Sequence, residues 1–237
     1  IEEAKDLVNR GVKELILVAQ ETTMYGKDIY GKKSLHILLK KLAEIQGIQW
    51  IRILYCYPEE IYDELIETIA TEKKICHYLD IPIQHASDDI LKRMGRRTSN
   101  KQLREIIGKL RKRIPDIILR TTLISGFPGE TQEDHDILMK FVNEMEFDRL
   151  GVFTYSPEEN TPAASMPDQI DEEVKNFRRN EIMELQQDIV FDTTEKYVGK
   201  EFIAMIEGKI SGEHAYIART YMDCPGVDSN IFVMTDE

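Results

Sequence analysis

Hydrophobic and polar positions along the chain form two kinds of block. Short apolar runs are typical of strands buried in a parallel sheet, and longer segments with apolar residues every three or four positions are typical of amphipathic helices. We expect five strands, at residues 13–19, 50–55, 78–83, 117–124 and 150–155. Helical patterns separate them at the spacing of a repeated βα unit. The sequence therefore predicts an α/β fold with a parallel sheet.

Capping residues indicate where several helices begin. Two capping boxes are predicted, one from Ser99 with Gln102 and one from Thr131 with Asp134. Serine is also a favoured N-cap residue, and it precedes helical patterns at positions 34 and 87. We expect Ser34 and Ser87 to cap those helices.

After residue 155 the pattern changes. A proline-containing linker leads into a charged helix expected over 171–197, whose apolar side is expected to carry Val174, Phe177, Ile182, Leu185 and Ile189. From residue 199 the chain has short alternating runs separated by Gly, Pro and Asp, which is typical of a small antiparallel β module. A long helix therefore separates two β regions of different type.

These patterns suggest three parts. Residues 1–165 form a partial, open TIM-like (β/α) barrel, because a closed barrel needs about eight strands and this part supplies five. Residues 166–198 are a linker and the long helix, and 199–237 are an incomplete antiparallel β domain. The first residue, Ile1, is not a methionine, and the last part has few strands. We therefore expect a piece of a longer protein.

Composition narrows the class of partner and compartment. The net charge is -12 and 42% of residues are hydrophobic. A protein that binds mainly through phosphate contacts is usually basic, so nucleic acid is not the expected main partner. No apolar run approaches the roughly 18–20 residues of a membrane span, and no signal peptide pattern is present. We expect a cytoplasmic protein with no membrane contact.

The three cysteines are far apart in the sequence and form no metal-binding spacing. An odd, scattered set implies no disulfide framework and fits a reducing compartment. We expect Cys56, Cys76 and Cys224 to be small buried apolar residues.

Candidate chemistry lies where the strands end. All five predicted strands leave through polar loops containing Gly or Pro, and functional sites in such folds are assembled at that edge. After the fourth strand, Gly126 and Gly129 let backbone N–H groups approach a ligand, and the following helix N-terminus favours an anionic group. An ordinary βα turn is the alternative explanation.

Five segments at these strand ends closely resemble the radical S-adenosylmethionine (SAM) methylthiotransferases. They are QETTMYG (20–26), IPIQHAS (81–87), LKRMGRR (91–97), RTTLISGFPGE (120–130) and FTYSPEENTPA (153–163). Their order and spacing are similar to that family over essentially the whole chain, and the C-terminal part resembles the start of a TRAM domain. Jointly the motifs are specific, although each alone is weak.

Two branches of the family differ at positions that are present in this sequence. Gln84-His85-Ala86-Ser87 and the pair Glu158-Glu159 resemble the branch that modifies a ribosomal protein (RimO type) more than the tRNA-modifying branch (MiaB type). Asn160 stands where the first branch usually has glycine. Asparagine tolerates left-handed backbone, so we expect the turn to be kept.

The resemblance implies a reaction and its cofactors. SAM bound to one 4Fe–4S cluster would yield a 5′-deoxyadenosyl radical, which takes hydrogen from the β-carbon of an aspartate in a small-subunit ribosomal protein near the decoding centre. A second 4Fe–4S cluster, another SAM and an electron donor would complete methylthiolation. The cysteines that hold both clusters in the family are absent from this chain, so it carries no expected metal ligand and is expected to be inactive alone.

The resemblance also suggests site residues. Thr22 and Thr23 would reach the amino or carboxylate group of SAM, Gln84 would bind a ribose hydroxyl, and backbone near Ser125 would contact the adenine side. The full expected cofactor-binding set is Gln20, Thr22, Thr23, Gln84, Ser125, Gly126 and Phe127. The alternative for the two threonines and Gln84 is that they only cap their loops.

Two residues are candidates for catalysis. Arg120 lies within an apolar strand, where an unpaired charge is costly, so we expect it to pair with the carboxylate of SAM or of the target aspartate. Tyr155, with Phe153, is expected to shield the radical from water. For these two aromatics, a place in the hydrophobic core is the alternative.

A basic run at residues 92–113 opposes the net charge, with Glu105 as the acid within it. It suggests contact with ribosomal RNA, and a solvated helix face is the alternative.

Three rival functions remain: a tRNA adenosine methylthiotransferase, a non-catalytic ribosome-binding barrel and an ordinary barrel lyase.

Overall fold

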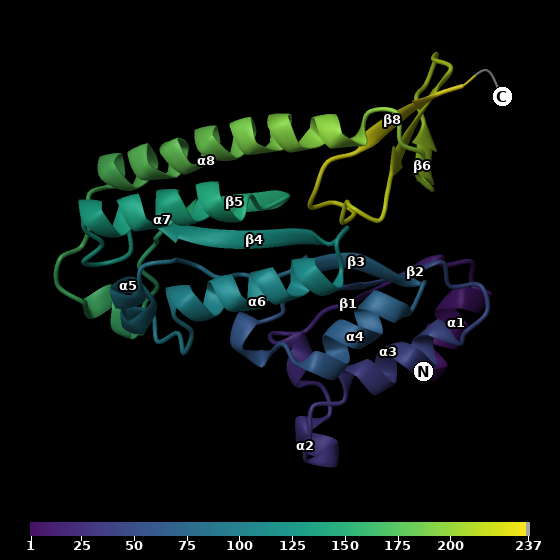
Figure 1. Cartoon of the computed structure of the whole chain (residues 1–237), viewed down its shortest axis with the longest axis horizontal. Coiled ribbons are helices and arrows are strands. Elements are labelled where there is room, and N and C mark those ends of the chain that lie inside the picture. Colours follow the sequence, from purple (N-terminus) through teal and green to yellow (C-terminus); the bar gives the residue numbers. More distant parts are fainter. Residues whose placement is uncertain (236–237) are drawn as a thin grey trace.

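In the computed structural model, which describes residues 1–235, the main body is one sheet of five parallel strands covered by helices. The strands are β1 (Glu14–Leu17), β2 (Trp50–Ile53), β3 (Ile75–Asp80), β4 (Ile118–Ser125) and β5 (Arg149–Thr154). They lie in chain order, so β1 and β5 are the open edges (Figure 1). The predicted α/β fold with a partial, open barrel is confirmed.

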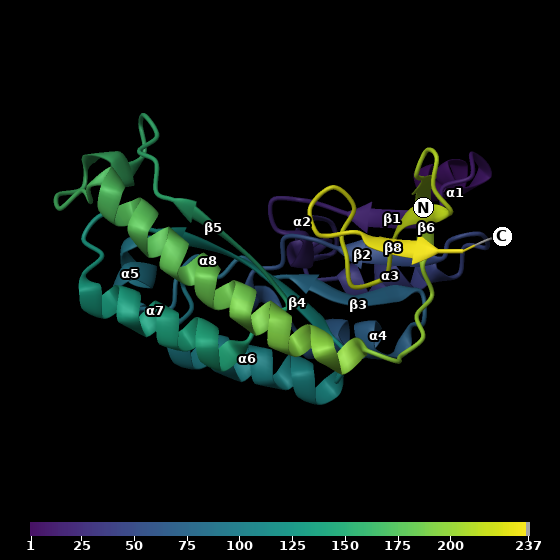
Figure 2. The same cartoon turned by 90° about the horizontal axis from the view of Figure 1, so that it is seen from above.

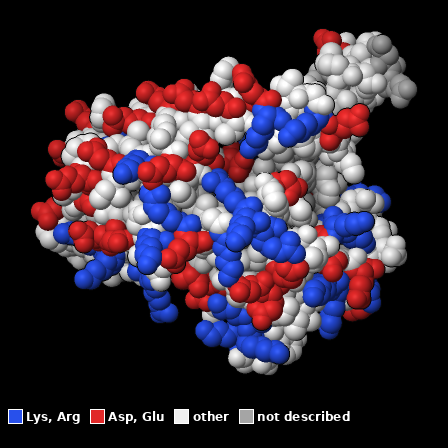
Figure 3. Space-filling model, viewed as in Figure 1, with Lys and Arg blue, Asp and Glu red and all other residues white. Residues whose placement is uncertain are grey.

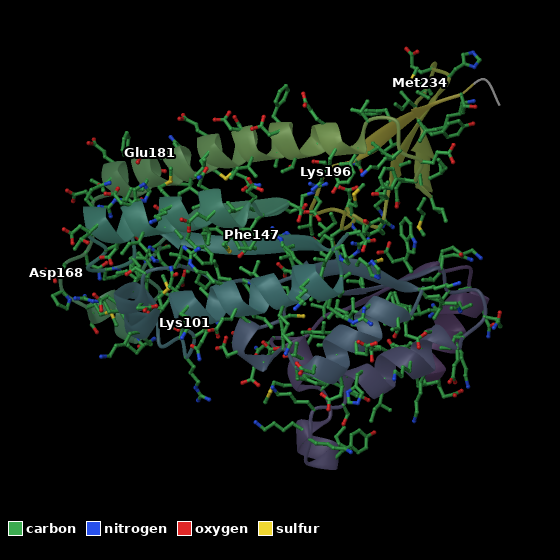
Figure 4. The ribbon with its side chains drawn as sticks, viewed as in Figure 1. Lys101, Phe147, Asp168, Glu181, Lys196 and Met234 are labelled. Atoms are coloured by element: carbon green, nitrogen blue, oxygen red, sulfur yellow. The ribbon has the colours of Figure 1, made fainter. Side chains whose placement is uncertain are left out.

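Helices pack on the outer face of this sheet. They are α1 (Glu2–Asn9), α3 (Leu35–Ala43), α4 (Asp63–Thr71), α6 (Asn100–Arg113), α7 (Gln132–Met145) and α8 (Glu172–Thr194). Ile51, Leu79 and Leu119 point outward from successive strands and are fully buried in the core between the two layers. Phe147, just before β5, is also fully buried there (Figure 4). The hydrophobic effect of these contacts fixes the helices to the sheet.

Short helices occupy the loops. They are α2 (Lys27–Tyr30), α5 (Asp88–Arg93) and the 3₁₀ turns Thr22–Met24, Pro58–Glu60, Pro162–Ser165 and Glu195–Tyr197. Several of them lie in the loops that follow β1, β2, β3 and β5, the loops predicted to carry the site.

The capping predictions are partly right. Both capping boxes form, at the starts of α6 and α7. Ser34 and Ser87 precede helices as expected, but neither side chain caps its helix. The Ser34 hydroxyl donates to the Lys32 carbonyl, and the Ser87 hydroxyl donates to Asp134. The acceptor of Ser34 is two residues away in the chain and that of Ser87 lies on α7, so a local and a distant acceptor each replace the helix N–H groups.

The third strand begins and ends three residues earlier than predicted, at Ile75–Asp80 instead of 78–83. Pro82 has no N–H to donate, and the chain beyond Asp80 keeps only scattered bonds to β4. The residues from 81 to 83 are still fully buried, which is why their apolar pattern was taken for a strand.

The long helix is present, and Ile182 and Ile189 are buried as predicted, but the rest of its buried side differs from the predicted one. Val174 and Phe177 are 38% and 61% exposed. The buried positions of α8 are Lys175, Arg178, Ile182, Gln186 and Ile189. Polar side chains thus take the inward positions of this helix, and their bonding explains why. Among them, the Gln186 side-chain amide donates to the buried Phe147 carbonyl at 2.7 Å.

The C-terminal module is an antiparallel sheet of β6 (Met205–Lys209), β7 (Ala215–Arg219) and β8 (Ile231–Met234). This confirms the predicted small antiparallel β region. It lies beyond the end of α8, on the side of the main sheet away from α3 and α4 (Figures 1 and 2).

The segment 219–228 of this module covers the inner face of the main sheet near the strands' N-terminal ends. Three arginines on that face meet it. Arg52 donates to the Tyr221 carbonyl (2.8 Å), Arg149 pairs with Asp223 (2.7 Å) and Arg120 lies 3.5 Å from Asp228. Cys76, Tyr78, Met222 and Cys224 form a small apolar cluster between them. The floor of the open barrel is therefore closed by the chain itself.

The basic run at 92–113 is opposed by acids, contrary to expectation. Glu144 of α7 pairs with Arg104 at 2.6 Å, and Glu67 of α4 pairs with Arg113 at 2.7 Å. Figure 3 shows basic and acidic side chains interleaved on this face. The acids come from helices distant in sequence, so they were invisible in the run itself.

Two neighbouring apolar residues of α7, one buried and one exposed, test the packing of the core. Leu138 is fully buried, whereas Ile137 is 43% exposed. We expect Leu138→Ala to lower the free energy of unfolding by about 2–5 kcal/mol and Ile137→Ala by less than about 0.5 kcal/mol. Denaturant unfolding of both variants measures this, and equal losses would contradict the packing described.

Candidate functional site

The C-terminal ends of the five parallel strands meet at one edge, which we call the rim. Gln20, Gln84, Gly126 and Tyr155 follow β1, β3, β4 and β5. Neighbouring loops are bonded to each other: the Tyr155 N–H donates to the Ser125 carbonyl at 2.8 Å. The structure thus brings the predicted site loops together.

The inner face near the rim is open. Whereas the floor is covered by the segment 219–228, Phe153 on β5 is 65% exposed and Val18, just after β1, is 59% exposed. Tyr55, just after β2, is 48% exposed. Large apolar side chains left uncovered along one edge are typical of a binding surface.

The first rim loop is held by its own side chains. The Thr22 hydroxyl donates to the Leu54 carbonyl at 2.6 Å and accepts from the Ala19 N–H at 3.1 Å. Thr23 bonds to Glu21 through both its N–H and its hydroxyl. Both threonine hydroxyls therefore shape the loop, and Gln20 beside them is exposed.

Gln84 has a left-handed backbone, with φ of +69°. This conformation costs roughly 1–3 kcal/mol for a residue other than glycine and is found preferentially at functional sites. Its N–H donates to the Thr122 carbonyl (3.0 Å) and its carbonyl accepts from Ile124 (2.8 Å), so β4 fixes the backbone. Its half-buried side-chain amide has no hydrogen bond to any other described residue. That amide is available to a ligand.

The turn after β4 is occupied by Glu130. Its Oε2 accepts from the N–H groups of Gly126 (2.7 Å) and Phe127 (3.2 Å). Its other oxygen pairs with Arg178 of α8 at 2.9 Å. These two N–H groups are therefore bonded within the chain, which differs from the expectation that they face a ligand.

The buried carboxyl of Glu130 is held ionised. Burial alone would raise its pKa, but the neighbouring His85 ring, the charge of Arg178 and the Gly126 N–H lower it below the ordinary value. His85 Nε2 lies 3.6 Å from Glu130, while His85 Nδ1 accepts from the Ser87 N–H at 2.9 Å. Glu130 therefore connects the segments 81–87 and 120–130 to α8.

Lys175 of α8 lies across Gly126. Its ammonium donates to the Tyr155 carbonyl at 3.0 Å, and the Ser125 hydroxyl donates to the Lys175 carbonyl at 3.1 Å. Gly126 has φ of +73°, and a Cβ there would lie 2.2 Å from Lys175 Cγ. The glycine is required because a side chain of the protein itself passes over it.

Tyr155 and Phe127 pack edge to face, with ring centroids 5.2 Å apart. Both are buried, in a cluster with Ile90. The Tyr155 hydroxyl is buried and has no hydrogen-bond partner within residues 1–235. A buried unpaired hydroxyl is costly, and this one is closed off within the apolar cluster.

Arg120 is already paired within the chain. Its Nη1 lies 2.8 Å from Asp80 on β3, and its Nε lies 3.5 Å from Asp228. The arginine thus has two carboxylate partners that the sequence did not reveal.

The cysteines of this chain do not fit an iron–sulfur cluster. All three are buried and free, as predicted. Burial raises the pKa of Cys76 to about 12 and that of Cys224 to about 11, so the thiolate ligand form is disfavoured. In the part of the chain that the structure describes, no three His, Cys, Asp or Glu residues are grouped to hold a metal.

Sequence reasoning missed four residues of this site: His85, Glu130, Lys175 and Arg178. Glu130 and His85 lie inside the recognised motifs, so their position was a usable signal. For Lys175 and Arg178, the signal was weaker: they occur at the helical spacing of the buried side of α8.

A parallel βα sheet with a polar rim and a closed floor defines a class of (β/α)-barrel proteins that bind ligands at the C-terminal ends of their strands. Residues 1–142 match the family model of the radical SAM superfamily. The chain belongs to that superfamily.

Curated relatives match over the whole chain. A protein of Lachnoclostridium phytofermentans named ribosomal protein uS12 methylthiotransferase RimO is 64% identical over 237 residues, which are 100% of this chain and 54% of that protein. A protein of the same name from Acetivibrio thermocellus is 52% identical, over 100% of this chain and 52% of its own length. The chain thus spans about half the length of these relatives.

Solved structures share the fold. Methylornithine synthase (PylB) has a TM-score of 0.53 and 14% identity, covering 79% of this chain and 52% of its own. The archaeal Methanocaldococcus infernus Elp3 has a TM-score of 0.52 and 12% identity, covering 92% of this chain and 68% of its own.

Within residues 1–235, no helix has the length and apolar character needed to cross a bilayer.

Gly126→Ala tests the approach of Lys175. A Cβ at this position meets Lys175, whereas a Cβ at Gly151 on β5 meets no atom within 4 Å. We expect Gly126→Ala to lower the free energy of unfolding by about 1–3 kcal/mol and Gly151→Ala to change it by less than about 0.5 kcal/mol. Thermal or denaturant unfolding distinguishes the two.

Glu130→Gln tests the ionised carboxyl. Because the folded-state pKa lies below the ordinary 4.5, the charge stabilises wild type above pH 4.5, and that stability is lost as pH falls through the lowered pKa. We expect the variant to be less stable at neutral pH by about 3–5 kcal/mol, since it leaves the buried Arg178 charge without the Glu130 carboxylate. The gap should shrink as the solution is acidified.

Unfolding curves at several pH values measure that gap. Exposed Glu133→Gln on α7 is the control and should follow wild type throughout. A gap that stays constant below pH 4.5 would show that the Glu130 charge is not the source.

Proposed function

We propose that this chain is the central part of a radical SAM methylthiotransferase that modifies ribosomal protein uS12. The observation that carries the proposal is the 64% identity to the L. phytofermentans protein of that name along all 237 residues. The rim supports it with an open, partly apolar surface and with the half-buried Gln84 side-chain amide, which no other described residue bonds.

The reaction proposed is addition of a methylthio group to the β-carbon of an aspartate. Bound SAM would supply the methyl group and the species that removes hydrogen from that carbon, and the second 4Fe–4S cluster would carry the sulfur that is inserted. The Gln84 amide would bind the adenosyl part. Gln20, Thr22, Thr23, Ser125, Gly126 and Phe127 would shape this site, with the two threonines and the Ser125–Phe127 turn holding its loops.

The role proposed for Arg120 follows from its pairing. With Asp80 and Asp228 as partners, it would position the rim instead of binding a carboxylate directly. Phe153 and the phenol ring of Tyr155 would keep water from the reacting centre.

The wider assembly is part of the same proposal. Two 4Fe–4S clusters would be held by cysteines outside this chain, and an external electron donor would reduce them. The substrate would be the ribosomal protein near the decoding centre, in the cytoplasm. The exposed basic side chains Lys92, Arg97 and Lys112 would contact ribosomal RNA.

Reconstitution tests the function. The complete protein is loaded with iron and sulfide, given SAM and a reductant, and offered protein uS12 and tRNA separately. We expect a mass gain of one methylthio group on an aspartate of uS12. A gain on tRNA alone would identify the tRNA-modifying activity, and no gain on either would favour a non-catalytic role.

Gln84→Ala tests the cofactor site. The variant removes an amide that no other described residue bonds, so we expect the Kd for SAM to rise by about tenfold, the value of one good hydrogen bond. Gln187→Ala, on the exposed side of α8, is the matched control and should leave the Kd unchanged. Equilibrium binding of SAM to the reconstituted protein measures both, and equal affinities would remove Gln84 from the site.

A further inference from the structure

Tyr55, the residue that begins the rim loop after β2, has a left-handed backbone with φ of +58°. This conformation is unfavourable for tyrosine by roughly 1–2 kcal/mol, so it persists only where the surroundings hold it. Its side chain is 48% exposed at the rim. Its carbonyl accepts from the Thr22 N–H at 3.0 Å. The geometry of Tyr55 therefore also sets the position of the first rim loop.

The group that holds Tyr55 is the buried carboxylate of Asp80, at the end of β3. Asp80 Oδ2 accepts from the Tyr55 N–H at 3.2 Å, and the Asp80 carbonyl accepts from the Cys56 N–H at 2.9 Å. Two successive N–H groups of the loop are thus bound by one residue of the neighbouring strand.

The second oxygen of that carboxylate fixes its orientation. Asp80 Oδ1 accepts from Arg120 Nη1 at 2.8 Å, across the β3–β4 pairing in which these two residues are opposite each other. A carboxylate with one donor on each oxygen cannot rotate without losing a charged hydrogen bond. The Arg120 guanidinium therefore determines where Oδ2 points.

Arg120 is in turn fixed by the C-terminal module. Its Nε lies 3.5 Å from Asp228 Oδ1, and the other Asp228 oxygen accepts from the Tyr78 hydroxyl (2.7 Å) and the Cys224 N–H (2.8 Å). The Asp228 side chain is buried, so it belongs to the interior contact between the module and the sheet.

We propose that Asp80 and Arg120 are positioning residues that couple docking of the C-terminal module, through Asp228, to the conformation of the rim loop at Tyr55. The chain of contacts is continuous: Asp228 to Arg120, Arg120 to Asp80, and Asp80 to the Tyr55 backbone. Its relevance to methylthiolation rests on the proposed function, but the coupling itself does not.

The same segment offers a matched control. Asp223 also pairs with an inner-face arginine, Arg149, at 2.7 Å. Arg149 does not contact Asp80 through any hydrogen bond or ion pair of the described residues. Asp223→Asn therefore weakens docking of the same segment without touching the proposed coupling.

Hydrogen exchange of the backbone amides tests this in the purified protein. We expect Asp80→Asn to speed exchange of the Tyr55 amide by about tenfold or more, because the Asn side chain has one accepting oxygen where the carboxylate offers one to Tyr55 and one to Arg120. We expect Asp228→Asn to speed exchange of the same amide by about threefold or more, and Asp223→Asn to change it by less than about twofold. Amides in α6 should be unchanged in all three.

Two results would overturn the proposal. One is that Asp228→Asn and Asp223→Asn accelerate the Tyr55 loop equally, which would mean that any loosening of the module has this effect. The other is that Asp228→Asn leaves the loop at the wild-type rate. If Asp80→Asn does not fold, the comparison of these two variants still decides the question.

Activity separates this inference from the proposed function. With the reconstituted complete protein, we expect Asp228→Asn to lower kcat/KM for uS12 more than Asp223→Asn does. A wild type that methylthiolates nothing, together with the expected exchange pattern, would end the proposed function and leave the coupling in place. If Asp228→Asn has normal activity and a wild-type exchange rate, the coupling proposal is overturned and the proposed function is kept.

Discussion

Buried arginines on the inner face of the sheet are the constraint on which the rest of the structure depends. Arg52 is fully buried, and a guanidinium cannot be neutralised at accessible pH. Leaving such a charge unpaired would cost several kcal/mol, so each arginine must meet an acceptor. The β strands supply some, but the segment 219–228 supplies the remainder. The C-terminal module is therefore required to complete the sheet.

This requirement divides the inner face into two halves. Toward the N-terminal ends of the strands, charges and a small apolar cluster are covered by the module. Toward the C-terminal ends, Phe153 and Tyr55 remain exposed and the Gln84 amide unused. Because the floor is closed by the chain, a ligand has access from the rim. The arrangement suits a superfamily whose chemistry needs a bound cofactor shielded on one side.

Polar side chains of α8 complete the rim from outside. Lys175 bonds the Tyr155 carbonyl, and Arg178 bonds both the carbonyl and the carboxylate of Glu130. Backbone groups at the ends of strands have lost their sheet partners, so they need acceptors or donors from elsewhere. Gly129 is favoured as glycine for another reason, its left-handed backbone with φ of +79°. The rim loops are rigid because the protein's own charges fill them.

The sequence alone determined the parallel sheet, both capping boxes, the antiparallel module and the family, because these depend on local periodicity and on motifs of contiguous residues. Asn160 also has the expected left-handed backbone, with φ of +65°. Only the tertiary structure decided what Arg120, Glu130 and the Gly126 turn bond to. Asp228, which pairs with Arg120, and Arg178, which pairs with Glu130, lie tens of residues or more away in the sequence. No spacing in the sequence reveals a contact that the packing of distant elements creates.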